Sequence, residues 1–150
     1  TVSHLQCNYI MTHMPDEHQK GLKKKYNNVL DELNIFFNER IKSCIEQGIG
    51  KEKIIIDPGI GFGKSGDDNI KILENINALK SIHTNICIGS SNKRFSSKLF
   101  EGIETKDDLK VANLATFAVS SLRGATYLRV HDVDITKDTT MIIDKVKNVS

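Results

Sequence analysis

Apolar residues along this chain alternate between short continuous runs and longer segments with helical spacing. The short runs predict strands at residues 7–11, 53–57, 85–89 and 126–130. The longer segments, in which an apolar residue recurs every three to four positions, predict helices over 29–45, 68–79, 109–122 and 136–146. Strands that alternate with helices in this way favour right-handed crossovers and a parallel sheet, so the predicted fold class is α/β.

Every predicted strand ends in a polar or glycine-rich cluster. These clusters are Thr-His-Met at 12–14, Asp-Pro-Gly at 57–59, Gly-Ser-Ser at 89–91 and Arg-Val-His-Asp at 129–132. In parallel α/β proteins the carboxyl ends of the strands share one rim, and ligands bind there. The pattern therefore predicts a single site built from all four strand ends.

The run Asp-Pro-Gly-Ile-Gly-Phe-Gly-Lys at residues 57–64 is the strongest chemical signal. Asp57 can accept two hydrogen bonds from the amidine-like edge of a flat ring such as a pterin, and Phe62 can pack on a ring face. The glycines allow the backbone to approach such a ligand closely. A tight turn, in which the aspartate caps the next helix, explains the same residues about equally well.

Two further clusters carry candidate ligand-binding groups. Lys93, in the loop after the third strand, can donate to a carbonyl, although a solvated loop lysine is the simpler interpretation. Arg129 and His131 alternate along the fourth strand end, so both face the same way and suit a phosphate or diphosphate. An Arg129–Asp132 ion pair beside a structural histidine fits this spacing equally well. His13, alone at a strand end, is more typical of a structural histidine.

The charge balance excludes a dedicated nucleic-acid surface. Lys and Arg total 21 against 19 Asp and Glu, a net charge of +2. The one basic cluster, at residues 20–25, is typical of a solvated loop, whereas binding nucleic acid without sequence preference needs a broad basic patch. No apolar run approaches the roughly 18 residues needed to span a bilayer, so no membrane segment is predicted.

The three cysteines, Cys7, Cys44 and Cys87, are widely spaced and lie in apolar stretches. This pattern favours reduced core residues of a cytoplasmic protein over a disulfide framework. No Cys/His spacing matches a zinc site. The same pattern, with no signal peptide visible, predicts a cytoplasmic location.

Taken together in order, the motifs resemble those of dihydropteroate synthase. That family carries Asp-Pro-Gly-x-Gly-Phe-x-Lys, Gly-x-Ser-Arg-Lys and Arg-Val-His-Asp-Val, which stand here at residues 57–64, 89–93 and 129–133. The resemblance implies that residues 1–150 are a partial pterin-binding domain, the C-terminal half of a TIM (β/α)8 barrel with four βα units. The sequence departs from the family at Asn92, where an arginine is usual, and at Thr12, where a methionine is usual.

The resemblance also implies a reaction, in which 6-hydroxymethyl-7,8-dihydropterin diphosphate condenses with p-aminobenzoate to give 7,8-dihydropteroate for folate synthesis. Asp57 and Lys93 would be catalytic and would hold the pterin, whose slot Gly61 and Phe62 would line. Ser91 would lie near the p-aminobenzoate. Arg129 and His131 would bind the departing diphosphate.

The first half of the barrel is not represented in these 150 residues. We expect the ligand of a Mg²⁺ ion to come from that half, with no metal ligand in this chain. Because position 1 is Thr1, we expect a fragment, a split-gene product or part of a bifunctional protein, which needs the missing half or a second copy as its partner. Two alternatives are a non-catalytic fragment, favoured by Asn92 and Thr12, and a methyltetrahydrofolate methyltransferase, which does not need the pair Arg129 and His131.

Overall fold

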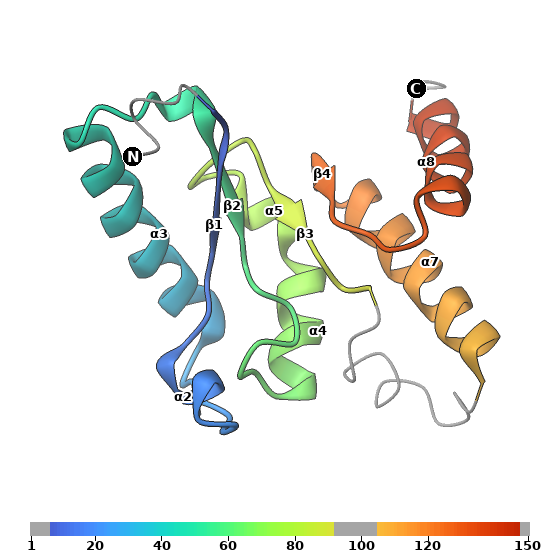
Figure 1. The fold of residues 1–150 in the computed structure, drawn as a ribbon, viewed down its shortest axis with the longest axis horizontal. Coiled ribbons are helices and arrows are strands. Elements are labelled where there is room, and N and C mark those ends of the chain that lie inside the picture. Colours follow the sequence, from blue (N-terminus) through green and yellow to red (C-terminus); the bar gives the residue numbers. More distant parts are fainter. Residues whose placement is uncertain (1–6, 92–104, 148–150) are drawn as a thin grey trace.

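The computed structural model describes residues 7–91 and 105–147. In this part of the chain, four short parallel strands form the centre. Strands β1 (Tyr9–Thr12) and β2 (Ile54–Asp57) pair in parallel, with Thr12 opposite Asp57. Strands β3 (Cys87–Ile88) and β4 (Tyr127–Leu128) form a second parallel pair. A parallel bridge between Ile56 and Ile86 joins the two pairs, so the strands follow one another across the molecule in chain order (Figure 1). The predicted parallel pairing is confirmed for these strands.

The helices lie between successive strands and after the last one. They are α2 (Asp16–Gln19), α3 (Val29–Glu46), α4 (Gly66–Glu74), α5 (Ile76–Leu79), α7 (Lys106–Leu122) and α8 (Val133–Lys147), with a 3₁₀ turn, η1, at Lys51–Lys53. Capping boxes start α4 at Ser65 and α7 at Thr105, each with an aspartate three residues on. The single helix predicted over 68–79 is instead two helices, because the backbone leaves helical geometry at Asn75.

The core lies where α3, α4 and α5 pack on the strands. Helix α3 buries Val29, Leu33, Phe37 and Ile41, which belong to the apolar face that its spacing predicted. Ile45, the last residue of that predicted face, is exposed instead. The buried residues of α3 meet isoleucines from the strands and from α4 and α5. These are Ile54, Ile56, Ile72, Ile76, Ile86 and Ile88, all of them fully buried. At about 1.5–3 kcal/mol for each buried side chain, this cluster holds the strand ends in place.

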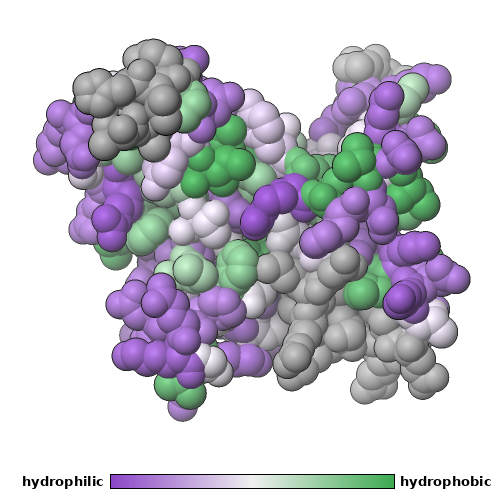
Figure 2. All heavy atoms as spheres, viewed as in Figure 1, coloured by the Kyte–Doolittle hydropathy of each residue, from purple (hydrophilic) through white to green (hydrophobic). Residues whose placement is uncertain are grey.

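The α7 and α8 side is less well covered. Helix α7 packs mainly against α8, and both helices leave apolar side chains exposed, namely Val111, Val119, Leu122, Val133, Ile135, Met141, Ile142 and Val146. Figure 2 shows apolar groups at the surface on this side of the molecule. Among the helices that the structure describes, none is long and apolar enough to cross a membrane.

The prediction that Cys7 is a core residue is wrong. Cys7 precedes β1 and is exposed, although all three cysteines are free thiols. His83 is buried against η1. Its Nε2 lies 3.1 Å from the Lys51 carbonyl oxygen, and its Nδ1 accepts from the Asn85 amide at 3.0 Å. The histidine thus joins the start of β2 to the segment that leads into β3.

Candidate active site

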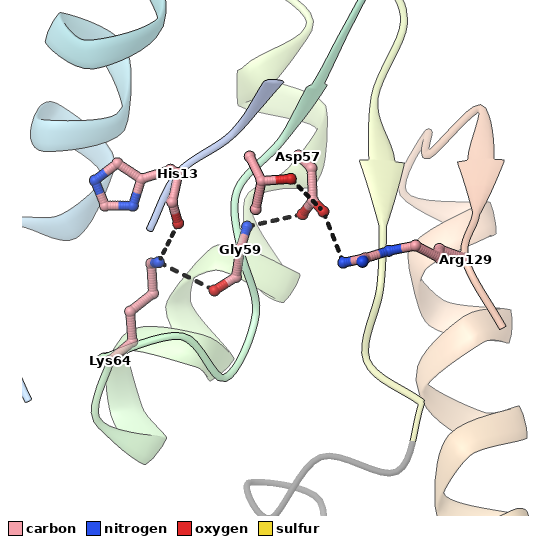
Figure 3. Close-up of polar contacts among 6 residues, drawn as sticks. His13, Asp57, Gly59, Lys64 and Arg129 are labelled. Atoms are coloured by element: carbon pink, nitrogen blue, oxygen red, sulfur yellow. Dashed lines mark hydrogen bonds and ion pairs between the residues drawn. The ribbon is translucent and has the colours of Figure 1, made fainter. Parts of the chain in front are cut away.

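Three strand ends converge around the carboxylate of Asp57 (Figure 3). This residue ends β2 and is fully buried. Its Oδ1 accepts from the Gly59 amide at 2.8 Å. Its Oδ2 accepts from Thr12 at the end of β1 at 3.3 Å and from Nη2 of Arg129, just after β4, at 3.1 Å. The carboxylate is therefore held by groups from two other strand ends and from its own loop.

The electrostatics of Asp57 depend on these donors. Burial raises the pKa of its carboxyl, because a charged group loses hydration in the interior. The Gly59 amide, the Arg129 guanidinium and the Thr12 hydroxyl act in the opposite direction and favour the charged form. An ionised carboxylate at this position is therefore stabilised by hydrogen-bond donors and a cation. Such a carboxylate can also accept hydrogen bonds from a ligand edge that is rich in N–H groups.

Arg129 reaches Asp57 by crossing the end of β3. Its guanidinium lies directly against Gly89, where an added Cβ would be 2.8 Å from Nη2 and 2.9 Å from Nε. A larger residue at position 89 would therefore push the guanidinium aside. About half of the Arg129 side chain is exposed, at 52%. The cation is consequently anchored on one side and open to solvent on the other.

The loop after β2 is held from inside by Lys64. The Lys64 side chain is buried, and its Nζ donates to three backbone carbonyls, of His13 at 3.1 Å, Gly59 at 3.0 Å and Phe62 at 3.3 Å. Burial lowers the pKa of Lys64 to about 8. Gly59 has a φ of +69°, and a Cβ there would lie 2.1 Å from the His13 carbonyl oxygen. This position consequently requires glycine.

The residues predicted to line a pterin slot lie further along the same loop. The Gly61 amide donates to the buried side chain of Asn69 on α4 at 2.8 Å. The half-buried Phe62 ring packs edge-on against the ring of His18, with 5.1 Å between the ring centroids. Both residues are thus fixed by neighbours, and their contact with a ligand stays a prediction.

Ser91, which follows β3, contacts His131, which follows β4. Ser91 Oγ lies 2.9 Å from His131 Nδ1, and the serine is buried while the histidine is exposed. The contact fixes the orientation of the imidazole at the strand end that precedes α8. Lys93, together with Asn92 and Arg94, lies outside the described residues. Its predicted role stays a prediction, as does the p-aminobenzoate contact of Ser91.

Some functional candidates were not found from sequence. Thr12 and Lys64 carried no assigned role, yet one donates to Asp57 and the other fixes its loop. His13 is buried, as expected of a structural histidine, and its ring meets Phe36 edge-on with 4.8 Å between centroids. Burial lowers its pKa to about 3, so this ring is neutral at physiological pH. The alternative Arg129–Asp132 ion pair is not formed within the described part of the chain, where Arg129 pairs with Asp57.

Metal ligands are not gathered in the parts of the chain that the structure describes. Over residues 7–91 and 105–147, no group of three or more histidine, cysteine, aspartate or glutamate side chains is placed to hold an ion. These residues by themselves do not fit a metal centre. We therefore derive no step of the chemistry through a metal ion.

Comparison with known proteins places this site in a family. The family model described as "Pterin binding enzyme" matches residues 1–131. The chain belongs to this family. Asp57, Arg129 and His131 all fall within the matched range.

The relatives of this chain include a dihydropteroate synthase and a bifunctional folate synthesis protein. The dihydropteroate synthase of Escherichia coli strain K12 is 32% identical over 120 residues, which are 80% of this chain and 42% of that enzyme. The mitochondrial folate synthesis bifunctional protein of Pisum sativum is 30% identical across 97% of this chain and 30% of its own length. The chain thus spans less than half the length of these relatives.

Solved structures agree with this placement. Dihydropteroate synthase of Xanthomonas albilineans, solved with 4-aminobenzoic acid, superposes with a TM-score of 0.90 at 34% identity, covering 99% of this chain and 55% of that one. The same enzyme in complex with 7,8-dihydropteroate gives a TM-score of 0.87 at 33% identity, covering 97% and 54%. The α/β fold is therefore that of a dihydropteroate synthase over about half of its length.

Proposed function

We propose that this chain is the C-terminal half of a cytoplasmic dihydropteroate synthase, with its four strands forming half of a (β/α)8 barrel. It would condense 6-hydroxymethyl-7,8-dihydropterin diphosphate with p-aminobenzoate once the N-terminal half is supplied. The observation that carries this proposal is the buried Asp57 carboxylate, held at one rim beside the half-exposed guanidinium of Arg129. One group suits the N–H edge of a pterin and the other suits its diphosphate.

In this proposal the residues act by positioning and by charge. Asp57 accepts hydrogen bonds from the pterin and balances the positive charge that develops on its methylene carbon as diphosphate leaves. Gly61 and Phe62 line the ring slot, and Lys93 donates to the pterin carbonyl. Arg129 and His131 stabilise the departing diphosphate, so no covalent nucleophile is needed. Ser91 holds His131 and faces the p-aminobenzoate.

The other half of the barrel completes the site. Four strands cannot close a barrel, and we place the ligand of a Mg²⁺ ion in the N-terminal half. The partner of this chain is accordingly that half, or a second copy of the chain. No step proposed for Asp57, Arg129 or His131 uses the ion.

Reconstitution tests the proposal. The 150-residue chain is mixed with a separately expressed N-terminal half from a homologous synthase, and dihydropteroate formation is followed from labelled p-aminobenzoate. We expect product in the mixture, none from either part alone, and loss of product with Asp57→Asn. Binding of 7,8-dihydropteroate without any turnover would identify a pterin-binding protein that is not a synthase. Failure to bind it in the mixture would overturn the proposal.

A further inference from the structure

Lys64 is a buried cation that the proposed chemistry does not use. Only 3% of its surface is exposed, although lysine is among the residues least often found in protein interiors. An ammonium group without partners would be strongly disfavoured there, so its three carbonyl contacts indicate a specific role. Within residues 7–91 and 105–147 it makes no ion pair with an acidic side chain, whereas a purely charge-balancing lysine would.

The three carbonyls belong to the two segments that surround Asp57. The His13 carbonyl lies just beyond the end of β1, while those of Gly59 and Phe62 lie in the loop after β2. The Gly59 residue is therefore held on both sides, because its amide donates to Asp57 at 2.8 Å and its carbonyl accepts from Lys64 at 3.0 Å (Figure 3). Lys64 thus acts on the carboxylate through a single intervening residue.

We infer that Lys64 is a positioning residue, which sets the Asp57 carboxylate and the Gly59–Phe62 loop in the geometry that receives a pterin ring. This inference rests on the proposed function and names the group that organises its pterin subsite. Arg129, half-exposed on the other side of Asp57, is free to turn toward a ligand, whereas Lys64 is enclosed and stays in place. Among the described residues, the subsite therefore combines a fixed cation, Lys64, with an adaptable one, Arg129.

The titration of Lys64 provides a readout specific to this role. The charged groups that act on it are Asp57, Asp68 and Lys24, and the neutral ring of His13 lies beside it. Burial lowers the pKa of Lys64 to about 8. Above this pH the ammonium becomes an amine, which is a weaker donor to the three carbonyls, so the loop should bind a pterin less tightly.

Protein stability should change in the opposite direction. Between about pH 8 and the ordinary pKa of lysine, the unfolded chain keeps a proton that the folded chain has lost. Linkage then makes the contribution of Lys64 to the free energy of unfolding rise with pH in this window. General loosening of the fold would lower both the pterin affinity and the free energy of unfolding. It therefore cannot explain an affinity that falls with pH while the contribution of Lys64 to the free energy of unfolding rises.

The test compares wild type, Lys64→Met and the matched control Lys71→Met, an exposed lysine on α4. Each chain is mixed with the N-terminal half, and the affinity for 7,8-dihydropteroate is measured by calorimetry from pH 7 to 10, with the ionisation of the free ligand measured in parallel. We expect Lys64→Met to raise the Kd roughly 10-fold or more at pH 7, the scale of one hydrogen bond to a charged group. The ratio of the Lys64→Met Kd to the wild-type Kd should become smaller above about pH 8. Lys71→Met should behave as wild type.

The outcomes separate the inference from the proposed function. If wild type fails to bind 7,8-dihydropteroate, the proposed function fails and the inference falls with it. If wild type binds and Lys64→Met binds equally well at every pH, Lys64 does not position the subsite. If circular dichroism shows that Lys64→Met does not fold, the pH dependence of the wild-type affinity is the deciding measurement. A wild-type Kd that stays constant from pH 7 to 10, after correction for ionisation of the ligand, overturns the inference.

Discussion

Replacing Gly89 with alanine should separate Arg129 from Asp57 without altering either residue. The added methyl group would sit 2.8 Å from Nη2 of Arg129. The guanidinium is the far end of a flexible and half-exposed side chain, so it moves more easily than the backbone does. Its 3.1 Å ion pair with Asp57 is then lost.

The size of the effect follows from the exposure of the pair. Exposed ion pairs contribute about 0.2–1 kcal/mol to stability, and hydrogen bonds to charged groups contribute about 1.5–3 kcal/mol. Because solvent screens the guanidinium, we expect a loss of about 1 kcal/mol at pH 7.

The pH dependence identifies the cause. Burial already raises the pKa of Asp57, and removing the Arg129 cation raises it further. The deficit of Gly89→Ala in unfolding free energy should therefore be present above the pKa of Asp57 and vanish as the pH falls through it, since a protonated carboxyl no longer needs the cation. Urea denaturation followed by circular dichroism, repeated from pH 7 downward, measures this deficit.

Gly66→Ala is the matched control. Position 66 begins α4 and has nothing within 4 Å of an added Cβ, so we expect a change of at most a few tenths of a kcal/mol at every pH. Arg129→Met should reproduce the deficit of Gly89→Ala and its pH dependence. A Gly89→Ala deficit of the same size at all pH values would refute the reasoning, because it would show that the backbone, and not the guanidinium, had moved.

Three further predictions concern the core and the rim. Phe37→Ala should lower the free energy of unfolding by about 3–5 kcal/mol in urea denaturation, since the ring is fully buried, whereas truncating exposed Ile35 should change it by under about 0.5 kcal/mol. Gly59→Ala should cost about 2 kcal/mol or more and speed amide exchange in its loop, because the position combines positive φ with a backbone clash; wild-type exchange rates would contradict this. Ser91→Ala should weaken diphosphate binding measured by calorimetry, since the His131 ring loses its 2.9 Å partner, and an unchanged affinity would show that the contact does not orient the ring.

Much of the fold followed from the spacing of apolar residues. Most positions that α3 buries were predictable from local periodicity, and the parallel pairing was predictable from the alternation of strands with helices. The break at Asn75 was not, since the apolar spacing continues across it from Leu73 to Ile76. Local pattern sets which face of a helix is buried, but it does not set where the backbone turns.

The candidate site was predictable only in part. Asp57 and Arg129 were expected at one rim, because both follow strands of a parallel sheet. Their direct contact depends on the side-by-side order of β2, β3 and β4 and on the absent side chain of Gly89, which sequence alone does not reveal. Lys64 was missed because a lysine after a glycine-rich loop is normally solvated, and its burial results from the meeting of segments 51 residues apart.

The pairing of Arg129 with a buried carboxylate affects which anions can compete for this site. A simple anion such as phosphate or sulfate, on drawing Arg129 toward itself, leaves Asp57 without one of its donors in the interior. That loss weakens the net affinity for any such anion. A ligand that carries N–H donors beside its anionic group can replace the lost contact as it binds. The pair therefore favours molecules that join both groups over the abundant inorganic anions of a cell, without steric exclusion of the smaller competitors.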